Sequence, residues 1–259
     1  GFLRGQIGGA DANATLGDSL RQWISRRSAG AQPQNVVAVL VLALVLVFGS
    51  RHLLTRSVPA IGEFVPFPDR ARDLLRLGWS SWRDVGIGSD AAPPTAYGLL
   101  GLAGLILLGA TDLLRSLLIV GTLPMGLYGM WRLGRFGEHS RAKGAMVLAY
   151  AANPLPYNAL VAGQWRALAL YALLPWVVRS LAAAGGLQPF ADAERRTPLP
   201  AAVAAVAVQV ATLAALAPAT AVPVLVCALA LVIGSVIGGQ ALAGVRVLGV
   251  AALGGAIGL

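Results

Sequence analysis

The chain has 259 residues, of which 57% are hydrophobic and only 12% charged, and its formal net charge is +9 at pH 7. Apolar content this high, with the charges gathered in a few short stretches, excludes a water-soluble domain. The arginines flank apolar stretches, where positive charge sets topology and meets anionic lipid, so the charge does not indicate nucleic-acid binding. Only helices or closed barrels satisfy backbone polar groups in lipid, and barrel-like alternation is absent. The predicted fold is therefore all-α, a polytopic bundle of membrane helices.

A polar stretch, residues 1–34, precedes the first apolar run. It is rich in Gly, Ala and Ser, and we interpret it as a cytoplasmic linker or the tail of a preceding domain. The first span is predicted from Val36 to Leu54, and the arginines before it place the N-terminus in the cytoplasm. Residues 35–259 are predicted to form one transmembrane domain. The chain is expected to be truncated at both ends, because it opens without methionine and closes inside an apolar run.

Residues 55–111 are predicted to form an external loop after the first span. Within it, apolar residues recur at helical spacing from Ala71 to Trp82, while Arg70, Asp73 and Arg76 fall on another face. This pattern predicts a juxtamembrane helix whose tryptophans lie at headgroup depth. The Gly- and Pro-rich residues 85–94 predict an irregular loop after it.

Two topologies differ in whether Thr95 to Ala110 crosses the membrane. If this run crosses, the basic residues around Arg132 to Lys143 and at Arg195 and Arg196 lie outside. If it rests on the outer face, both basic clusters lie in the cytoplasm, as the positive-inside rule favours. The run is about 16 residues long and holds three glycines, which is marginal for a span. The sequence therefore favours the second topology, with juxtamembrane helices in the first external loop.

The other predicted spans bring the total to about seven crossings. They alternate in direction, beginning with an inward span, and run from Asp112 to Leu133, Ala145 to Val161, Ala167 to Ala184, Ala201 to Leu216, Ala221 to Ile237 and Ala241 to Leu259. Two of them contain glycines four residues apart, Gly234 with Gly238 and Gly254 with Gly258, a spacing that permits close helix approach.

Candidate catalytic residues lie in the external loop, which holds the densest group of carboxylates in the chain. A carboxylate near the membrane surface can act as general base on an acceptor hydroxyl. Asp69 and Asp73 are better explained as a helix cap and an ion-pair partner. Glu63, Asp84 and Asp90 lie in Pro- and Gly-rich stretches, where capping explains them less well. These three are the candidate bases.

Candidate substrate-binding residues lie at a second place, where Pro154 and Pro156 interrupt a predicted span near its outer end. Backbone freed in this way survives at membrane depth only when it is buried in protein or lines a wet cavity. Arg166 either contacts a phosphate or extends to the surface beside an interfacial Trp165, and the sequence leaves both readings open. The set of candidate binding residues is Arg83, Asn153, Tyr157, Gln164, Trp165 and Arg166.

Three strings of residues carry a resemblance to a known family. They are Trp82-Arg83-Asp84-Val85-Gly86-Ile87-Gly88-Ser89 with Pro93-Pro94, then Leu123-Pro124-Met125-Gly126-Leu127-Tyr128, and then Ala149-Tyr150-Ala151-Ala152-Asn153-Pro154-Leu155-Pro156 with Gly163. Together they resemble the membrane portion of large actinobacterial proteins in which a family 2 glycosyltransferase is fused to several spans. That portion is similar to the GT-C fold of cell-wall arabinofuranosyltransferases and protein mannosyltransferases.

The resemblance implies a multi-pass protein of the bacterial cytoplasmic membrane. It implies transfer of a sugar from a polyprenyl-phosphate donor to a cell-envelope polysaccharide acceptor on the outer face, with a catalytic carboxylate in the first external loop. The alternative is a non-catalytic scaffold that binds or translocates the lipid carrier for a fused cytoplasmic glycosyltransferase. A solute transporter is disfavoured because mid-span charges are few, Arg246 being the one candidate. No metal-binding motif is evident, and a divalent cation stays open as a cofactor.

Overall fold

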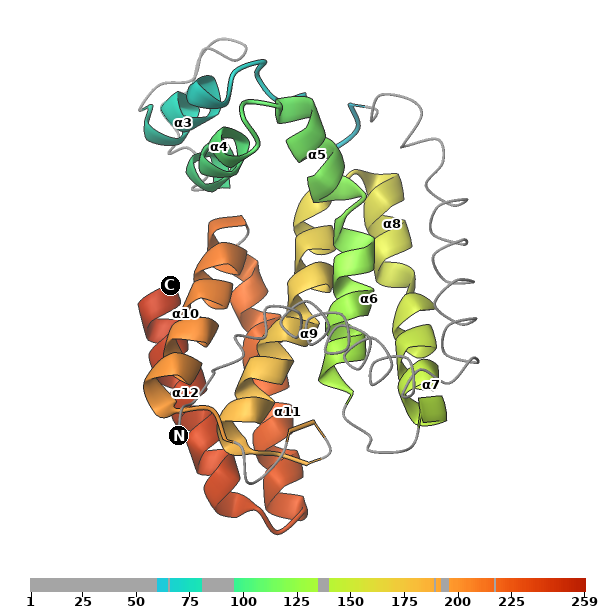
Figure 1. The fold of residues 1–259 in the computed structure, drawn as a ribbon, viewed down its shortest axis with the longest axis vertical. Helices are drawn as coiled ribbons and strands as arrows, with labels where there is room; N and C mark the ends of the chain where they lie inside the picture. Colours follow the sequence, from blue (N-terminus) through green and yellow to red (C-terminus); the bar gives the residue numbers. More distant parts are fainter. Residues whose placement is uncertain are drawn as a thin grey trace, which may run out of the picture. The chain divides into compact units, whose positions relative to one another are not determined.

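The computed structural model describes residues 60–64, 66–80, 96–134, 140–188, 190–191, 196–216 and 218–259 (Figure 1). All of them belong to one compact unit, Leu44–Leu259. The predicted N-terminal tail, the predicted first span and residues 85–94 lie outside the described residues. Throughout the described ranges every regular element is helical, as predicted: α3 (Ala71–Trp79), α4 (Ala96–Ile106), α5 (Thr111–Ile119), α6 (Thr122–Leu133), α7 (Ser140–Ala151), α8 (Pro154–Ala162), α9 (Trp165–Gly185), α10 (Leu199–Leu216), η1 (Pro218–Thr220), α11 (Ala221–Ile237) and α12 (Ala241–Gly258).

Four helices, α9 to α12, are long and apolar enough to cross a membrane. Their bounds lie within a few residues of the four corresponding predicted spans. A large apolar surface also faces outward from α11, where Val222, Leu225 and Ile237 are all more than half exposed. Helices that are apolar all round are stable where the outer face meets lipid rather than water. The described part of the chain thus contains four of the predicted spans as single helices of sufficient length and apolar character.

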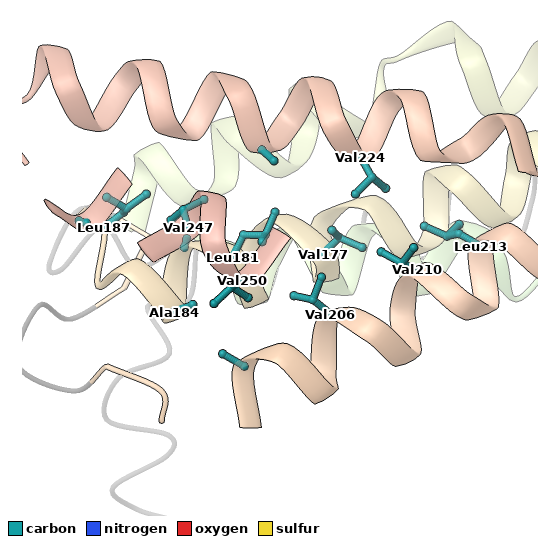
Figure 2. Close-up of a cluster of buried hydrophobic side chains, with 14 residues drawn as sticks. Val177, Leu181, Ala184, Leu187, Val206, Val210, Leu213, Val224, Val247 and Val250 are labelled. Carbon is teal, nitrogen blue, oxygen red and sulfur yellow. The ribbon is translucent and has the colours of Figure 1, made fainter. Parts of the chain in front are cut away.

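The largest core joins these four helices. Val177 and Leu181 of α9, Val206 of α10 and Val247 of α12 are completely buried there, and Figure 2 shows their side chains converging from the separate helices. Most members are alanine or valine, whose short side chains let neighbouring helices approach closely. Packing of this kind, together with a few polar contacts, stabilises helix pairs in lipid, where the hydrophobic effect between helices is lost.

One of the two predicted glycine pairs is used for helix packing. A Cβ placed on Gly254 would lie 2.9 Å from Val206 Cβ, and one on Gly258 would lie 2.6 Å from the Ala207 carbonyl oxygen, so both glycines let α12 approach α10. A Cβ on Gly234 would meet nothing within 4 Å. Spacing alone does not distinguish the two pairs, because it does not reveal which helix face meets a neighbour.

Proline interrupts the hydrogen-bond ladder inside α9. Pro175 has no N–H to donate to the Tyr171 carbonyl four residues earlier. The Tyr150 hydroxyl of α7 donates to that carbonyl oxygen at 2.6 Å, and the two tyrosine rings stack with centroids 4.5 Å apart. A side chain from a neighbouring helix therefore satisfies the group that proline leaves open, as membrane helices require.

Two predicted spans are each divided into two helices. The span from Asp112 to Leu133 is interrupted between α5 and α6, just before Pro124, which cannot donate to the Val120 carbonyl. The span from Ala145 to Val161 is interrupted between α7 and α8, where the Asn153 side chain accepts from Leu155 N at 2.9 Å. This second break lies immediately before Pro154, as predicted from the two prolines, and α8 continues beyond it from Pro154 to Ala162.

The amphipathic helix predicted in the external loop is α3, and it packs on α4. Ala71 and Leu74 are buried, and the contact is close: a Cβ on Gly78 would lie 2.7 Å from Gly98 N, and one on Gly104 would lie 3.0 Å from Ala71 Cβ. Asp73 pairs with Arg76 at 3.8 Å, as predicted. The predicted cap at Asp69 was wrong, since α3 begins after Arg70 and no side chain caps it.

The α4 helix begins and ends at the same end of the bundle. Its first residue, Ala96, belongs to a buried cluster with Ala169 of α9 and Leu216 of α10, whereas its last turn leads into α5 through a bend of 116°. Leu100 and Leu114 join α4 to α5 in another cluster. Together α4 and α5 are long and apolar enough for one span that is broken by this bend, or for a re-entrant loop.

The described basic residues of both predicted cytoplasmic clusters lie at the opposite end. The α6 and α9 helices run parallel, since Gly126 packs on Tyr171 and Gly129 on Trp176. Arg132, near the end of α6, is therefore at the same end as the turn after α9, where Thr197 N donates to the Ala183 carbonyl. Arg246 of α12 also reaches this turn, because its Nη2 donates to the Thr197 carbonyl at 2.9 Å. A side chain tied to a loop in this way does not indicate a transport pathway.

Candidate functional site

The site is built on a tight turn, residues 60–64, in the segment predicted to form the external loop. Phe64 N donates to the Ile61 carbonyl at 2.9 Å, and Gly62 between them has a φ of +58°, which favours glycine. The Phe64 side chain is buried in a cluster with Ile119, Leu123 and Leu168. Because Phe64 is buried, the turn is held against the bundle. Glu63, the residue before Phe64, lies along the surface of the bundle.

The second component is the junction of α8 and α9. Gly163 has a φ of +67° and ends α8 in a left-handed cap, and Gln164 N donates to the Ala159 carbonyl at 2.8 Å. The chain then reverses and α9 begins at Trp165, so the first backbone N–H groups of α9 are presented at the bundle end.

These two components contact each other directly. Glu63 N donates to the Gly163 carbonyl at 2.7 Å. A Cβ on Gly62 would lie 2.5 Å from the Ala162 carbonyl oxygen, and one on Gly163 would lie 2.1 Å from the Ile61 carbonyl oxygen. Both glycines are therefore required by close backbone approach as well as by φ. The 60–64 turn and the end of α8 therefore meet in a close-packed contact.

Charge is concentrated at this contact. The Arg166 guanidinium forms an ion pair with the Glu63 carboxylate, with Nε donating to Oε1. The Arg166 backbone N donates to the other carboxylate oxygen, Oε2, at 3.4 Å. Glu63 thus also supplies negative charge to the N-terminus of α9, where the helix dipole favours it. The Arg166 side chain is 53% exposed and that of Glu63 23%, so the pair is open to the surface.

A buried arginine of α5 holds the turn through a hydrogen bond. Arg115 of α5 is only 8% exposed, and its Nη2 donates to the Phe64 carbonyl oxygen at 2.6 Å. Sequence reasoning did not single out this residue. The signal available was its position inside a predicted span, where a charged side chain needs a polar partner.

The geometry of the ion pair defines which further contacts Glu63 and Arg166 can make. Each oxygen of the Glu63 carboxylate accepts one hydrogen bond within the protein and keeps a second lone pair that can accept from an incoming hydroxyl. Arg166 has further donors and an exposed guanidinium, so an oxyanion can approach it from the surface. Exchange of Arg166 from the carboxylate to a phosphate would release Glu63.

The other predicted binding residues are only partly brought to this place. Gln164 and Trp165 adjoin Arg166 at the junction, and Gln164 is exposed. The Trp165 ring packs against three separate buried clusters, so it joins the bundle to α3 and α4. Asn153 caps α8 and lies about 13 Å away along that helix, at 1.5 Å per residue. Tyr157, about half exposed, lies between them on α8.

Three of the predicted residues, Arg83, Asp84 and Asp90, lie outside the described residues. Among the residues that the structure does describe, no group of three or more His, Cys, Asp or Glu side chains could hold a metal ion. The site that the structure places is therefore the Glu63–Arg166 pair with Gln164 and Trp165.

Comparison of the chain with models of protein families, with curated proteins and with solved structures gave no match. The fold and the site therefore define a class only. The residues that the structure describes form an all-helical protein of membrane type, with the Glu63–Arg166 contact at one end of its bundle.

Proposed function

We propose that this chain is the membrane module of a glycosyltransferase that uses a polyprenyl-phosphate-linked sugar. It transfers the sugar to a cell-envelope glycan at the outer face of a bacterial cytoplasmic membrane. The proposal includes a GT-C-like arrangement of about seven spans with a cytoplasmic N-terminus. In it, α5 with α6 and α7 with α8 each form one interrupted span, and α4 lies on the outer surface.

The observation that supports the proposal is the Glu63–Arg166 pair. It joins a carboxylate of the external loop to the arginine expected to bind phosphate, at the bundle end opposite Arg132 and Arg196. An enzyme of this kind needs a base for the acceptor hydroxyl and a cation for the departing phosphate, close together at headgroup depth. Asp84 and Asp90 belong to the same external loop and are the other two candidate bases.

In the proposed reaction, a carboxylate takes the proton of an acceptor hydroxyl while that oxygen forms a bond to the anomeric carbon of the donor. The bond between that carbon and the phosphate oxygen breaks, and the electron pair leaves with polyprenyl phosphate. Arg166 stabilises the phosphate charge, with Arg83 as a further candidate. Donor binding would also draw Arg166 from Glu63, which frees the lone pairs that the ion pair occupies.

The test is transfer of radiolabel from polyprenyl-phosphate pentoses and hexoses to cell-envelope glycan in membranes that contain the protein. Removal of a general base costs about a hundred- to ten-thousandfold in rate. We therefore expect one of Glu63→Gln, Asp84→Asn and Asp90→Asn to bind donor normally and barely turn over. Asp112→Asn changes an exposed carboxylate on α5 and serves as the matched control. Near-normal transfer in all three variants would refute catalysis by this loop.

The alternative function, a non-catalytic scaffold for the lipid carrier, is favoured by the engagement of both Glu63 oxygens within the protein. Under it, Arg166→Gln weakens retention of polyprenyl phosphate, while no carboxylate variant changes transfer. Under the transferase proposal, Arg166→Gln raises the apparent KM for donor. Unchanged donor binding and kinetics in a folded Arg166→Gln variant would return Arg166 to the role of a surface anchor.

Topology is tested separately by cysteine labelling. In a Cys227→Ser background, a cysteine at Gly137 is expected in the cytoplasm and should not react with an impermeant reagent in intact cells. Reaction there would show that the basic clusters face outward and that residues 95–110 cross the membrane.

A further inference from the structure

A cavity of about 580 Å³ lies between the first half of α3 and the last turn of α4, away from the Glu63–Arg166 pair. Arg70, Arg72 and Arg76 line one side of it, and Leu105 and Leu108 line the other. Two carboxylates, Asp69 and Asp73, also line it. Because there are three arginines and two carboxylates, the lining has an excess of positive charge. Guanidinium groups suit oxyanions because they offer several donors in one plane.

The apolar side of this cavity is unusually exposed. Leu108, which lines the cavity, is 97% exposed; Ile106, in the last turn of α4, is 81% exposed, and Trp79, at the opposite end of the α3–α4 pair, is 82% exposed. In water, three large apolar side chains on one small two-helix element would be unfavourable. They are the side chains that enter a bilayer at headgroup and upper acyl depth when a helix pair lies on its surface.

The backbone at Leu108 is held in a conformation that suits glycine. Gly109 N donates to the Gly104 carbonyl at 2.8 Å and Leu108 N to the Leu105 carbonyl at 3.0 Å, which is the Schellman pattern for a helix end. The residue at the left-handed position of that pattern is usually glycine, but here it is Leu108, with a φ of +55°. Such strain is retained where surrounding structure or function requires the side chain. Contact with lipid would explain why leucine stands at this position, whereas contacts within the described protein do not explain it.

We propose that this cavity binds the headgroup of an anionic phospholipid. The phosphate lies among Arg70, Arg72 and Arg76, and the acyl chains follow Leu105 and Leu108 into the bilayer. Charge complementarity and the exposed Leu105 and Leu108 beside the arginines favour a lipid over a free anion, which would leave these leucines in water. The proposal requires only that α3 and α4 lie on a membrane, and it does not depend on the transferase activity.

The test measures which lipid is enriched beside α4. A fluorophore is attached to Ile106→Cys in a Cys227→Ser background, and the full chain is reconstituted in phosphatidylcholine nanodiscs. Each sample contains the same small fraction of spin-labelled lipid, either phosphatidylglycerol or phosphatidylcholine. We expect stronger quenching by phosphatidylglycerol. Each arginine near an anionic surface changes association by about fivefold, so Arg72→Gln with Arg76→Gln weakens it by about thirtyfold and removes the difference.

The matched control is Arg132→Gln with Arg196→Gln, which removes the same charge from exposed arginines at the other end of the bundle. It should leave the preference for phosphatidylglycerol intact, and helical circular dichroism verifies that both double variants are folded. Equal quenching by the two lipids in the otherwise unsubstituted protein would overturn the proposal. So would a preference that survives in Arg72→Gln with Arg76→Gln, or one that inorganic phosphate abolishes, since the latter identifies a free-anion site.

Discussion

Replacement of Tyr150 by phenylalanine tests how the bundle accommodates proline inside α9. The hydroxyl donates at 2.6 Å to the Tyr171 carbonyl, which Pro175 cannot reach because it has no N–H. Phenylalanine retains the ring stacked at 4.5 Å and removes only the donor. An unsatisfied buried acceptor costs about 1–3 kcal/mol, whereas hydrogen bonds between membrane helices average about 0.6 and reach about 1.7 kcal/mol. We therefore expect Tyr150→Phe to lower the free energy of unfolding by about 1–2 kcal/mol.

The decisive measurement is the same substitution in a Pro175→Ala background. Alanine restores an N–H that can donate to the Tyr171 carbonyl within α9, so loss of the Tyr150 hydroxyl then leaves no open acceptor. The cost of Tyr150→Phe should fall to a few tenths of a kcal/mol, giving a coupling energy of about 1 kcal/mol. Unfolding by sodium dodecyl sulfate in mixed micelles, followed by circular dichroism, measures all four proteins of the cycle.

Tyr157→Phe, the same chemical change at a half-exposed tyrosine of α8, is the matched control and should change stability little. An equal cost of Tyr150→Phe with and without Pro175 would refute the reasoning. It would show that the hydroxyl stabilises the protein in some way other than by satisfying the carbonyl that proline leaves open.

Three further substitutions test the site and the packing. Gly163→Ala places a Cβ 2.1 Å from the Ile61 carbonyl oxygen, and we expect it to detach the 60–64 turn, seen as increased proteolysis there while helicity is retained; full protection of the turn would contradict the contact. Trp165→Ala removes a ring shared by three clusters and should cost roughly 2–4 kcal/mol in the same micelle unfolding assay; a loss under about 0.5 kcal/mol would place the ring in lipid instead. Gly254→Val overpacks the contact of α12 with α10 and should lower the free energy of unfolding by about 1–3 kcal/mol. Gly234→Val meets open space and should lower it little. Equal costs of the two substitutions would refute the assignment of the packed face.

The sequence by itself determined the all-helical class and the bounds of α9 to α12. Long apolar runs that are bounded by Gly, Pro or charged residues form helices in lipid, because every backbone group in a span must be bonded within its own helix. The amphipathic helix α3 was also predictable, since helical periodicity is local information. The packing of α3 on α4 was not predictable, because the glycines of α4 that contact α3 could equally have faced lipid.

Only the tertiary structure decided which distant residues meet. Glu63 and Arg166 were each singled out by chemistry, but their pairing depends on Phe64 being buried and on two glycines that allow the backbones to touch. Arg115 gained its role because the Phe64 carbonyl lies within its reach. The bend of 116° between α4 and α5 was likewise not evident from the sequence, whereas the break before α8 was, because Pro154 marks it. Such contacts join residues 50 to 100 positions apart, and periodicity, propensity and spacing along a chain carry no information about them.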